Sequence, residues 1–142
     1  MIQRVPKKRL ALICSDDYQI TNAAIDRTAL KKLLIDFIEQ KGIIDILSGL
    51  EPELGLLAAE IVLELKHLFP IRLECVIPYE EYTTHWSEPL RNRFFRVMGL
   101  CDTETLLQTH FSMDSFQKRA AYLQKESDYL LYLERLTVPA SV

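Results

Sequence analysis

The stretch IIDILSGLEPELGLLAAEIVLELKHLFPIRLECVI, residues 43–77, decides the fold. It begins with the apolar run Ile43–Leu47, continues as a helical pattern opened by Pro52, and ends with a second apolar run, Ile71–Ile77. Short apolar runs bounded by turn residues are typical of buried strands, and a broad apolar face between them is typical of a helix packed on a sheet. The stretch therefore predicts a strand–helix–strand unit of a parallel sheet.

The same alternation extends to both sides of this stretch. Further strands are predicted at Leu10–Cys14, Thr103–Thr109 and Tyr129–Leu133. Further helices are predicted from Thr21 or Asn22 to Gln40, with Gly42 just past the end, from Glu88 to Leu100, and from Ser112 or Asp114 to Lys125. Because crossovers between parallel strands are right-handed, we expect an α/β, three-layer doubly wound, Rossmann-like fold, with a mainly parallel sheet of about five strands and helices on both faces.

Length and composition narrow the class of protein. The 142 residues fit a single domain, residues 1–142, in which residues 134–142 are expected to form a frayed tail. Hydrophobic residues at 49%, charged residues at 26% and a net charge of -3 exclude a disordered chain and argue against non-specific binding of nucleic acid. No apolar stretch is long enough for a membrane span or a signal peptide. Three cysteines without a disulfide pattern suit a reducing compartment, so we expect a cytoplasmic protein.

Ligands of doubly wound folds bind beyond the carboxyl ends of the strands, where the strand order reverses. Ser15, Ser48 and Gly49 follow the first two predicted strands, and Gly49 alone among the glycines stands where a phosphate could approach the backbone. Tyr79, Tyr82 and Trp86 follow the third strand and are candidates for stacking on a purine, although aromatic residues in such loops also cover the edge of a core.

Acidic residues flank the predicted helix starts at this edge, namely Asp16, Asp17, Glu51 and Glu53. They are expected to stabilise their own helices, by about 0.3–1 kcal/mol each, and to repel a phosphate. Two alternatives stay open: a Mg²⁺ ion that bridges acids and phosphates, or a neutral ligand. His67, His85 and His110 have no metal-ligand spacing, and no order of catalytic residues is legible, so no metal or catalytic residue and no cofactor is assigned.

Leu47-Ser48-Gly49 followed by Ala58-Ala59-Glu60 resembles the YpsA-like family of the SLOG superfamily. That superfamily groups Rossmann-like domains related to the DNA-processing protein DprA and to the LOG cytokinin-activating enzymes. The resemblance continues through VIPYEEYTTHW, residues 76–86, and through Ser115–Leu133, where a helix with Lys and Arg precedes an SD step into an apolar strand. It implies a Rossmann-like fold that binds nucleotides or nucleotide-derived ligands, and it supplies no catalytic residues.

The chain departs from the family pattern at several positions. The family carries a Thr-Gly-rich turn after the first strand, where this chain has Cys14-Ser15-Asp16-Asp17. After the Ser-Gly, the family carries another glycine and then an acidic residue, where this chain has Glu53 and Gly55. Arg119 is what remains of an Arg-Asn-Arg-like stretch, and the family's last glycine-rich loop, helix and strand have no counterpart beyond Val138.

Three functions follow as hypotheses. The first is a protein that binds a nucleotide or nucleotide-derived small molecule through Ser15, Ser48, Gly49, Tyr79, Trp86 and Arg119. The alternative is a degenerate family member that has lost its ligand and serves as a protein-interaction or assembly module, with a homodimer as the expected partner. The third, which the sequence favours least, is a nucleotide or N-glycosidic-bond hydrolase with Glu60 and Arg119 as its pair. No nucleic-acid or membrane partner is expected.

Overall fold

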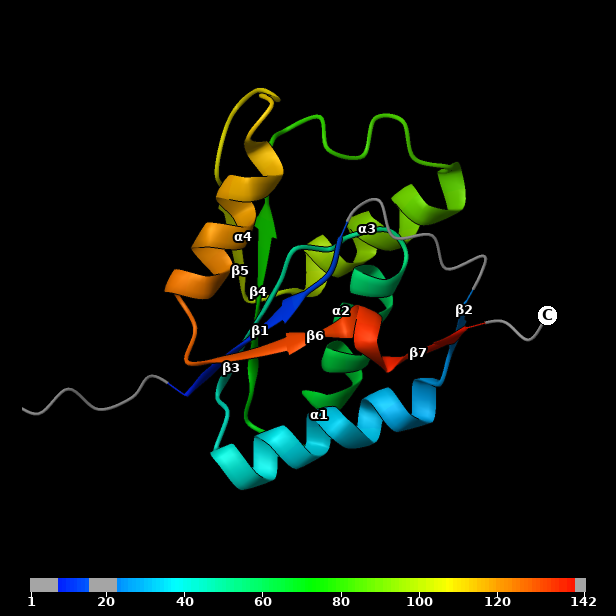
Figure 1. Ribbon diagram of the computed structural model, residues 1–142, viewed down its shortest axis with the longest axis vertical. Coiled ribbons are helices and arrows are strands. Elements are labelled where there is room, and N and C mark those ends of the chain that lie inside the picture. Colours follow the sequence, from blue (N-terminus) through cyan, green and yellow to red (C-terminus); the bar gives the residue numbers. More distant parts are fainter. Residues whose placement is uncertain (1–7, 16–22, 140–142) are drawn as a thin grey trace, which may run out of the picture.

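The computed structural model describes residues 8–15 and 23–139, and its centre is a parallel sheet (Figure 1). The five strands of this sheet are β1 (Arg9–Ile13), β3 (Asp45–Ser48), β4 (Arg72–Ile77), β5 (Thr103–Leu106) and β6 (Tyr129–Tyr132). Their order is β5-β4-β3-β1-β6, so the order reverses at β1, with β3 on one side and β6 on the other.

Four helices cover the two faces of the sheet. They are α1 (Arg27–Lys41), α2 (Leu54–Leu65), α3 (Glu88–Leu100) and α4 (Ser115–Lys125). The first three pack into one large apolar core, whereas α4 packs into a separate, smaller cluster on the opposite face. Figure 1 shows α4 across the sheet from the other helices. The predicted α/β, three-layer doubly wound, Rossmann-like fold is confirmed.

Alternation along the strands divides the side chains between the two cores. Leu10 and Leu12 of β1 belong to the large core, and Ala11 between them belongs to the smaller cluster with Leu47 and Val76. Successive side chains of a strand point to opposite faces, so a strand buried on both faces is apolar throughout. This explains why the central strands read as continuous apolar runs in the sequence.

A polar network also holds α4 against the sheet. The Glu74 carboxylate of β4 accepts hydrogen bonds from Arg9 Nη2 at 2.7 Å, from Tyr122 Oη at 2.6 Å and from Thr105 Oγ1 at 3.0 Å. Desolvation raises the pKa of the Tyr122 phenol, and its hydrogen bond to Glu74 raises this pKa further. Since Tyr122 belongs to α4, the network fixes where this helix sits on the sheet.

Two helix starts differ from the prediction. Helix α1 begins at Arg27, because the Asp26 side chain caps it by accepting a hydrogen bond from the Ala29 amide at 2.9 Å. The predicted caps Thr21 and Asn22 lie outside the described residues. Helix α2 begins at Leu54 rather than at Pro52, with Glu53 as its N-cap.

The C-terminal segment forms regular structure where a frayed tail is expected. A 3-10 turn, η2 (Leu133–Leu136), follows β6 and leads into β7 (Thr137–Pro139). Strand β7 pairs in antiparallel fashion with β2 (Ala23–Ile25), which precedes α1. Residues 140–142 lie outside the described part of the chain. The two short strands thus join segments from opposite ends of the sequence (Figure 1).

The position of Gly42 yields a first prediction. Gly42 has φ of 66° and ends α1 in the left-handed conformation, as predicted from the sequence. Gly42→Ala is expected to lower the free energy of unfolding by about 1–2 kcal/mol, because a Cβ disfavours this conformation. Gly99→Ala is the matched control, since an added Cβ meets nothing within 4 Å at either position. In helix α3 that change is expected to raise the free energy by up to about 1 kcal/mol, and equal effects in urea titrations would contradict the interpretation.

Candidate functional site

The carboxyl edge of the sheet gathers the residues that follow β1, β3, β4 and β6. At the reversal point, the Ser15 amide after β1 donates a hydrogen bond to the Glu134 carboxylate after β6. This bond links the ends of the two strands between which the strand order reverses. Ser15 is exposed here, so its position is one from which a ligand at the edge could be contacted.

A tight turn follows β3. The Ser48 hydroxyl accepts a hydrogen bond from the Leu50 amide at 3.1 Å, and both residues are fully buried. Leu50 has φ of 53°, a left-handed conformation that costs a residue with a branched side chain about 1–3 kcal/mol. The Ser48 oxygen therefore shapes the turn. Strained turns of this kind persist where the surrounding structure imposes them, and they cluster at binding sites.

The turn places a carboxylate against an arginine of α4. Arg119 Nη2 lies 3.7 Å from Glu51 Oε2, and the two side chains are only 4% and 1% exposed. Burying two charges costs several kcal/mol per ion, and only their mutual attraction and further hydrogen bonds offset it. The pair is thus a costly feature at the edge where doubly wound folds bind ligands.

Two glycines leave room for this pair. A Cβ at Gly49 would lie 2.6 Å from Glu51 Oε2 and 3.0 Å from Arg119 Cδ. A Cβ at Gly55 would overlap Glu51 Oε1. In the family pattern an acidic residue stands at position 55. In this chain Gly55 leaves the space free of a side chain, and the carboxylate of Glu51 fills it.

Aromatic rings enclose the guanidinium of Arg119. Its Nη1 donates a hydrogen bond to Tyr82 Oη at 3.1 Å. The guanidinium carbon lies 5.6 Å from the centre of the Tyr82 ring and 5.2 Å from the centre of the Phe116 ring, within the range of cation–π attraction. The charge is therefore stabilised from several sides, which allows it to remain buried.

Tyr79, Phe111 and Phe116 form a group of mutually packed aromatic side chains near Arg119, called the aromatic lip below. Tyr79 contacts Tyr82, Phe111 and Phe116, with ring centres 5.8, 5.3 and 6.2 Å apart. Phe111 is 53% exposed and Phe116 37% exposed. Trp86 lies on the other side of Tyr82, where it packs edge-on at 5.1 Å, so one ring separates it from Arg119.

The start of α4 is tied to the loop before it. The Ser115 hydroxyl donates to Gln108 Oε1 at 2.7 Å and accepts from the Ser112 amide at 2.8 Å. Ser115, Arg119 and Leu123 are the buried residues of α4, and their spacing of four places them on one face of the helix. Anchoring this face at both ends directs Arg119 at the turn after β3.

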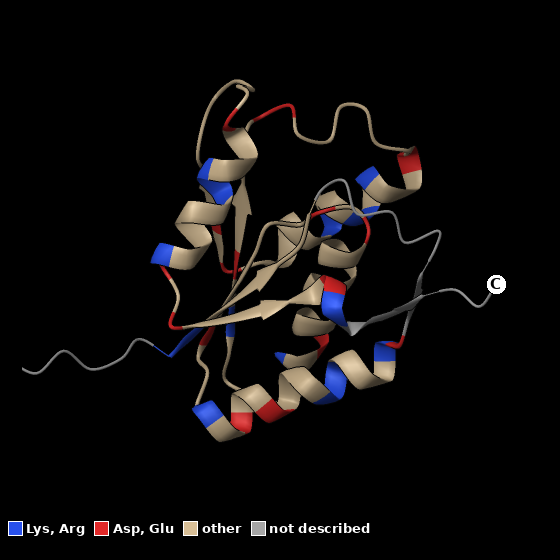
Figure 2. Ribbon diagram, viewed as in Figure 1, with Lys and Arg blue, Asp and Glu red and all other residues tan. Residues whose placement is uncertain are grey.

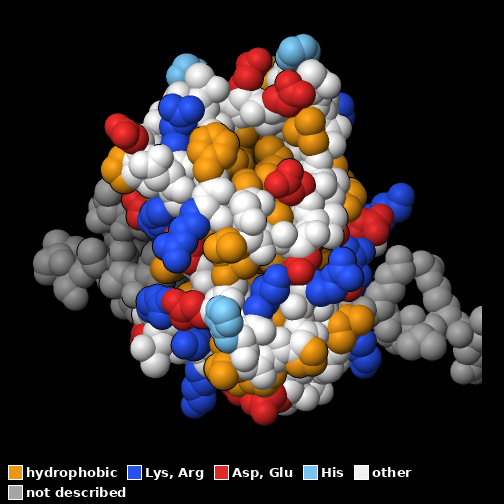
Figure 3. Space-filling view, turned by 180° about the vertical axis from the view of Figure 1, so that it is seen from behind, with side chains coloured by type: hydrophobic (Ala, Val, Ile, Leu, Met, Phe, Trp, Pro, Cys, Tyr) orange, Lys and Arg blue, Asp and Glu red, His pale blue; other side chains and the backbone are white. Residues whose placement is uncertain are grey.

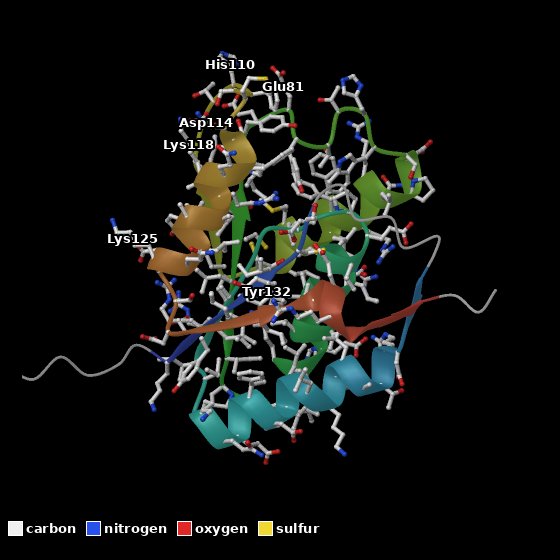
Figure 4. The ribbon with its side chains drawn as sticks, viewed as in Figure 1. Glu81, His110, Asp114, Lys118, Lys125 and Tyr132 are labelled. Carbon is white, nitrogen blue, oxygen red and sulfur yellow. The ribbon has the colours of Figure 1, made fainter. Side chains whose placement is uncertain are left out.

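The exposed face of the same helix carries a different cation. Lys118 is exposed and pairs with Asp114 at 3.5 Å, and both lie at the start of α4 in Figure 4. The hydrogen bond from the Ser112 hydroxyl lowers the pKa of Asp114 below its ordinary value. Lys118 is therefore a suitable control for the buried Arg119.

His110 and Glu81 lie 4.0 Å apart at the tips of the two loops that follow β5 and β4.

The sequence candidates separate into two groups. Gly49 and Arg119 come together at the buried pair. Tyr79 and Trp86 form the second group: each contacts Tyr82, whose ring lies over Arg119, and the Ser48 hydroxyl holds the turn. Sequence reasoning missed Glu51 as a partner of Arg119. It interpreted Glu51 as a helix-terminus acid, and no local pattern marks a contact between the turn and a distant helix. Phe116 was also missed, although it lies three residues before Arg119 on α4, a spacing at which two side chains of a helix are neighbours.

Glu60, which the hydrolase hypothesis pairs with Arg119, lies elsewhere. Its carboxylate accepts hydrogen bonds from Arg93 of α3 at 2.6 and 3.2 Å. Both residues belong to helices on the face opposite α4. The structure therefore does not bring Glu60 and Arg119 together, and the acidic neighbour of Arg119 is Glu51.

The described part of the chain has neither a metal-binding cluster nor a membrane-spanning helix. Within residues 8–15 and 23–139, no group of three or more His, Cys, Asp or Glu residues could hold a metal ion. None of the helices in the same ranges is long and apolar enough to cross a bilayer. Asp16 and Asp17, which the sequence places near a Mg²⁺ alternative, lie outside the described residues.

Cys75 of β4 and Cys101, which follows α3, form a pair of thiols. A hydrogen bond between the thiols lowers the pKa of Cys101 and raises that of Cys75, which burial raises further. Cys101 is half-buried and Cys75 is buried. We expect iodoacetamide to alkylate Cys101 first, because the thiolate is the reactive form. Cys75→Ala is expected to shift the pH midpoint of this reaction upward, and mass spectrometry that found Cys75 labelled first would contradict the assignment.

The Glu51–Arg119 pair yields a prediction about stability. Arg119→Met is expected to lower the free energy of unfolding by about 3–5 kcal/mol, because it leaves the Glu51 carboxylate buried without this cation. Glu51→Gln combined with Arg119→Met is expected to recover part of that loss, with a coupling energy of about 1–3 kcal/mol in a double-mutant cycle. Lys118→Met, the exposed control, should change stability by less than about 0.5 kcal/mol. Additive effects in the cycle would show that the two charges do not interact.

Comparisons with known proteins place this chain in a family. The YpsA model, described as the YspA SLOG family, matches residues 10–136, from β1 to η2. UPF0398 protein LBA1157 of Lactobacillus acidophilus is 31% identical over 79 residues, which are 56% of this chain and 42% of that protein. The aligned part thus spans less than half of the length of this curated relative. The resemblance inferred from the Ser-Gly and Ala-Ala-Glu motifs is confirmed, and the chain belongs to the YspA SLOG family.

Proposed function

We propose that this chain binds a nucleotide or nucleotide-derived small molecule at the carboxyl edge of the sheet, and that Arg119 holds its phosphate. The observation that carries the proposal is the buried guanidinium of Arg119 beside Gly49, 3.7 Å from Glu51. Doubly wound folds bind ligands at this edge, and the superfamily that this chain resembles implies nucleotide-derived ligands.

The chemistry of the pair supports binding better than it supports a structural role. An arginine offers a planar fork of donors that matches a phosphate. Charge-assisted hydrogen bonds of this kind measure about 2.7–2.9 Å, and the contact between Arg119 Nη2 and Glu51 Oε2 is longer, at 3.7 Å. A buried ion pair is in general a weak source of stability, so its presence at this edge favours a functional role.

The aromatic lip supports a base next to the phosphate. Phe111 and Phe116 are partly exposed, and the Phe116 ring lies 5.2 Å from the guanidinium of Arg119. Stacking of a base on an aromatic side chain contributes about 1–3 kcal/mol in nucleic-acid complexes. A ligand with its phosphate at Arg119 would therefore find a surface for its base within the same region.

Glu51 acts in this proposal as an internal competitor. Its carboxylate occupies the place beside Arg119 that the phosphate takes, so the ligand has to displace it. The turn from Ser48 to Glu51 includes the strained Leu50, and a rearrangement of this turn would relieve that strain. Two negative charges about 4 Å apart repel each other by roughly 1 kcal/mol even in bulk water. Neutralising Glu51 is therefore expected to strengthen binding.

The proposal predicts a thermal shift. AMP, ADP and ADP-ribose are expected to stabilise the chain, and adenosine, which lacks phosphate, is expected to have less effect. A ligand at 100 times its Kd adds about 2.7 kcal/mol of stability, a shift of a few degrees for a chain of this size. Glu51→Gln is expected to lower the Kd of the best phosphate ligand about fivefold or more.

Matched variants test the role of Arg119. Glu51→Gln combined with Arg119→Met should stay folded and lose the shift, whereas Lys118→Met, which removes the neighbouring exposed cation, should keep it. The proposal fails if no phosphate ligand shifts the wild-type chain. It also fails if Lys118→Met abolishes the shift as completely as the double variant does.

A further inference from the structure

A groove lies between α2 and α3, on the face of the sheet opposite α4. Its volume is about 540 Å³, and apolar side chains from both helices line it, namely Leu57, Leu63, Val97 and Leu100. Val97 is fully buried at the base, whereas Leu100 is 53% exposed. An exposed leucine beside half-buried ones marks a surface where further apolar area can be covered.

Basic side chains line the rim of this groove. Arg27 at the start of α1, Lys66 after α2 and Arg96 on α3 all lie on it. Figure 2 shows Lys and Arg residues along α3, and Figure 3 shows them gathered among hydrophobic side chains on the part of the surface where α3 lies. The rim therefore presents cations around an apolar floor.

The acidic residues of the groove are already engaged by cations of the same chain. Glu60 is bound by Arg93 at 2.6 Å, and Glu64 is bound by Arg27 and, at 3.5 Å, by Lys31. Lys66 is in turn paired with Asp102 at 2.6 Å. The residues that line the groove carry three cations, Arg27, Lys66 and Arg96, against two carboxylates, Glu60 and Glu64, a local charge of +1 in a chain whose net charge is -3.

This charge decides which occupant fits. A second copy of the chain, bound about a two-fold axis, would place the same positively charged patch against itself and be repelled. A flat membrane surface does not fill a concave groove. An amphipathic helix with apolar residues on one face and acidic residues beside them matches both the floor and the rim.

We propose that the groove between α2 and α3 binds an acidic amphipathic helix of a partner protein. The two flanking helices have 12 and 13 residues, about 18–20 Å in length. A partner helix of three to four turns would place apolar anchors at positions i, i+4 and i+7 along Leu57, Leu63 and Leu100. Its acidic residues would then face Arg96 and Lys66.

A designed peptide tests the proposal. The probe is a fluorescent helical peptide of about 14 residues, about 21 Å long, with leucines on one face and glutamates flanking them. The control peptide has lysine in place of each glutamate. Fluorescence anisotropy is expected to show binding of the acidic peptide and at least about tenfold weaker binding of the basic one, with affinity falling as salt rises.

Two pairs of variants locate the site. Arg96→Glu is expected to weaken binding of the acidic peptide about tenfold or more, whereas Arg91→Glu, an exposed change on α3 outside the groove, should leave it within about twofold. Leu100→Gln is expected to weaken binding similarly, whereas Leu68→Gln, at an exposed leucine outside the groove, should not.

Several results would overturn the proposal. It is wrong if neither peptide binds, if both peptides bind equally, or if Arg91→Glu weakens binding as much as Arg96→Glu. It is also wrong if vesicles of phosphatidylglycerol bind the chain through Arg96 while the acidic peptide does not. All four variants should retain the wild-type melting temperature within a few degrees, because each of the four substituted side chains is exposed.

Discussion

The buried contact between Arg119 and Glu51 is the constraint on which the carboxyl edge depends. It joins α4 on one face of the sheet to the turn that follows β3, and it needs Gly49 and Gly55 to be free of side chains. The turn that carries Glu51 requires Leu50 in a left-handed conformation and the hydrogen bond from the Leu50 amide to the Ser48 hydroxyl. Each of these features is unfavourable or unusual alone, and together they hold two opposite charges in one buried space.

The position of Arg119 depends on how α4 is attached to the sheet. One helix covers this face, and its apolar contact is the small cluster of Ala11, Leu47, Val76 and Leu123. The Glu74 network supplies the second attachment, through Tyr122 one residue before Leu123. Ser115 fixes the other end through Gln108. Since Arg119 lies midway between these anchors, its guanidinium is held at the carboxyl edge of the sheet, beside Gly49.

Much of the fold could be predicted because its signals are local. Helix α3 begins and ends at the predicted residues, Glu88 and Leu100, because Pro89 and the apolar spacing mark it within one segment. Strand β7 was not predicted, because its partner β2 lies near the other end of the chain. The acidic partner of Arg119 was missed for a similar reason. The family pattern has its acid at position 55, and only the three-dimensional turn shows that Glu51 fills that space.

Helix α2 connects the two regions that we consider functional. Its first turn is built on the segment that holds Glu51, since the Leu56 amide donates to the Glu51 carbonyl at 2.9 Å and the Leu57 amide to the Glu53 carbonyl at 2.8 Å. Leu57 is also part of the groove floor. Any rearrangement that separates Glu51 from Arg119 therefore begins next to the groove. By linkage, an effect of a phosphate ligand on a helix bound in the groove must be matched by an equal effect in the reverse direction.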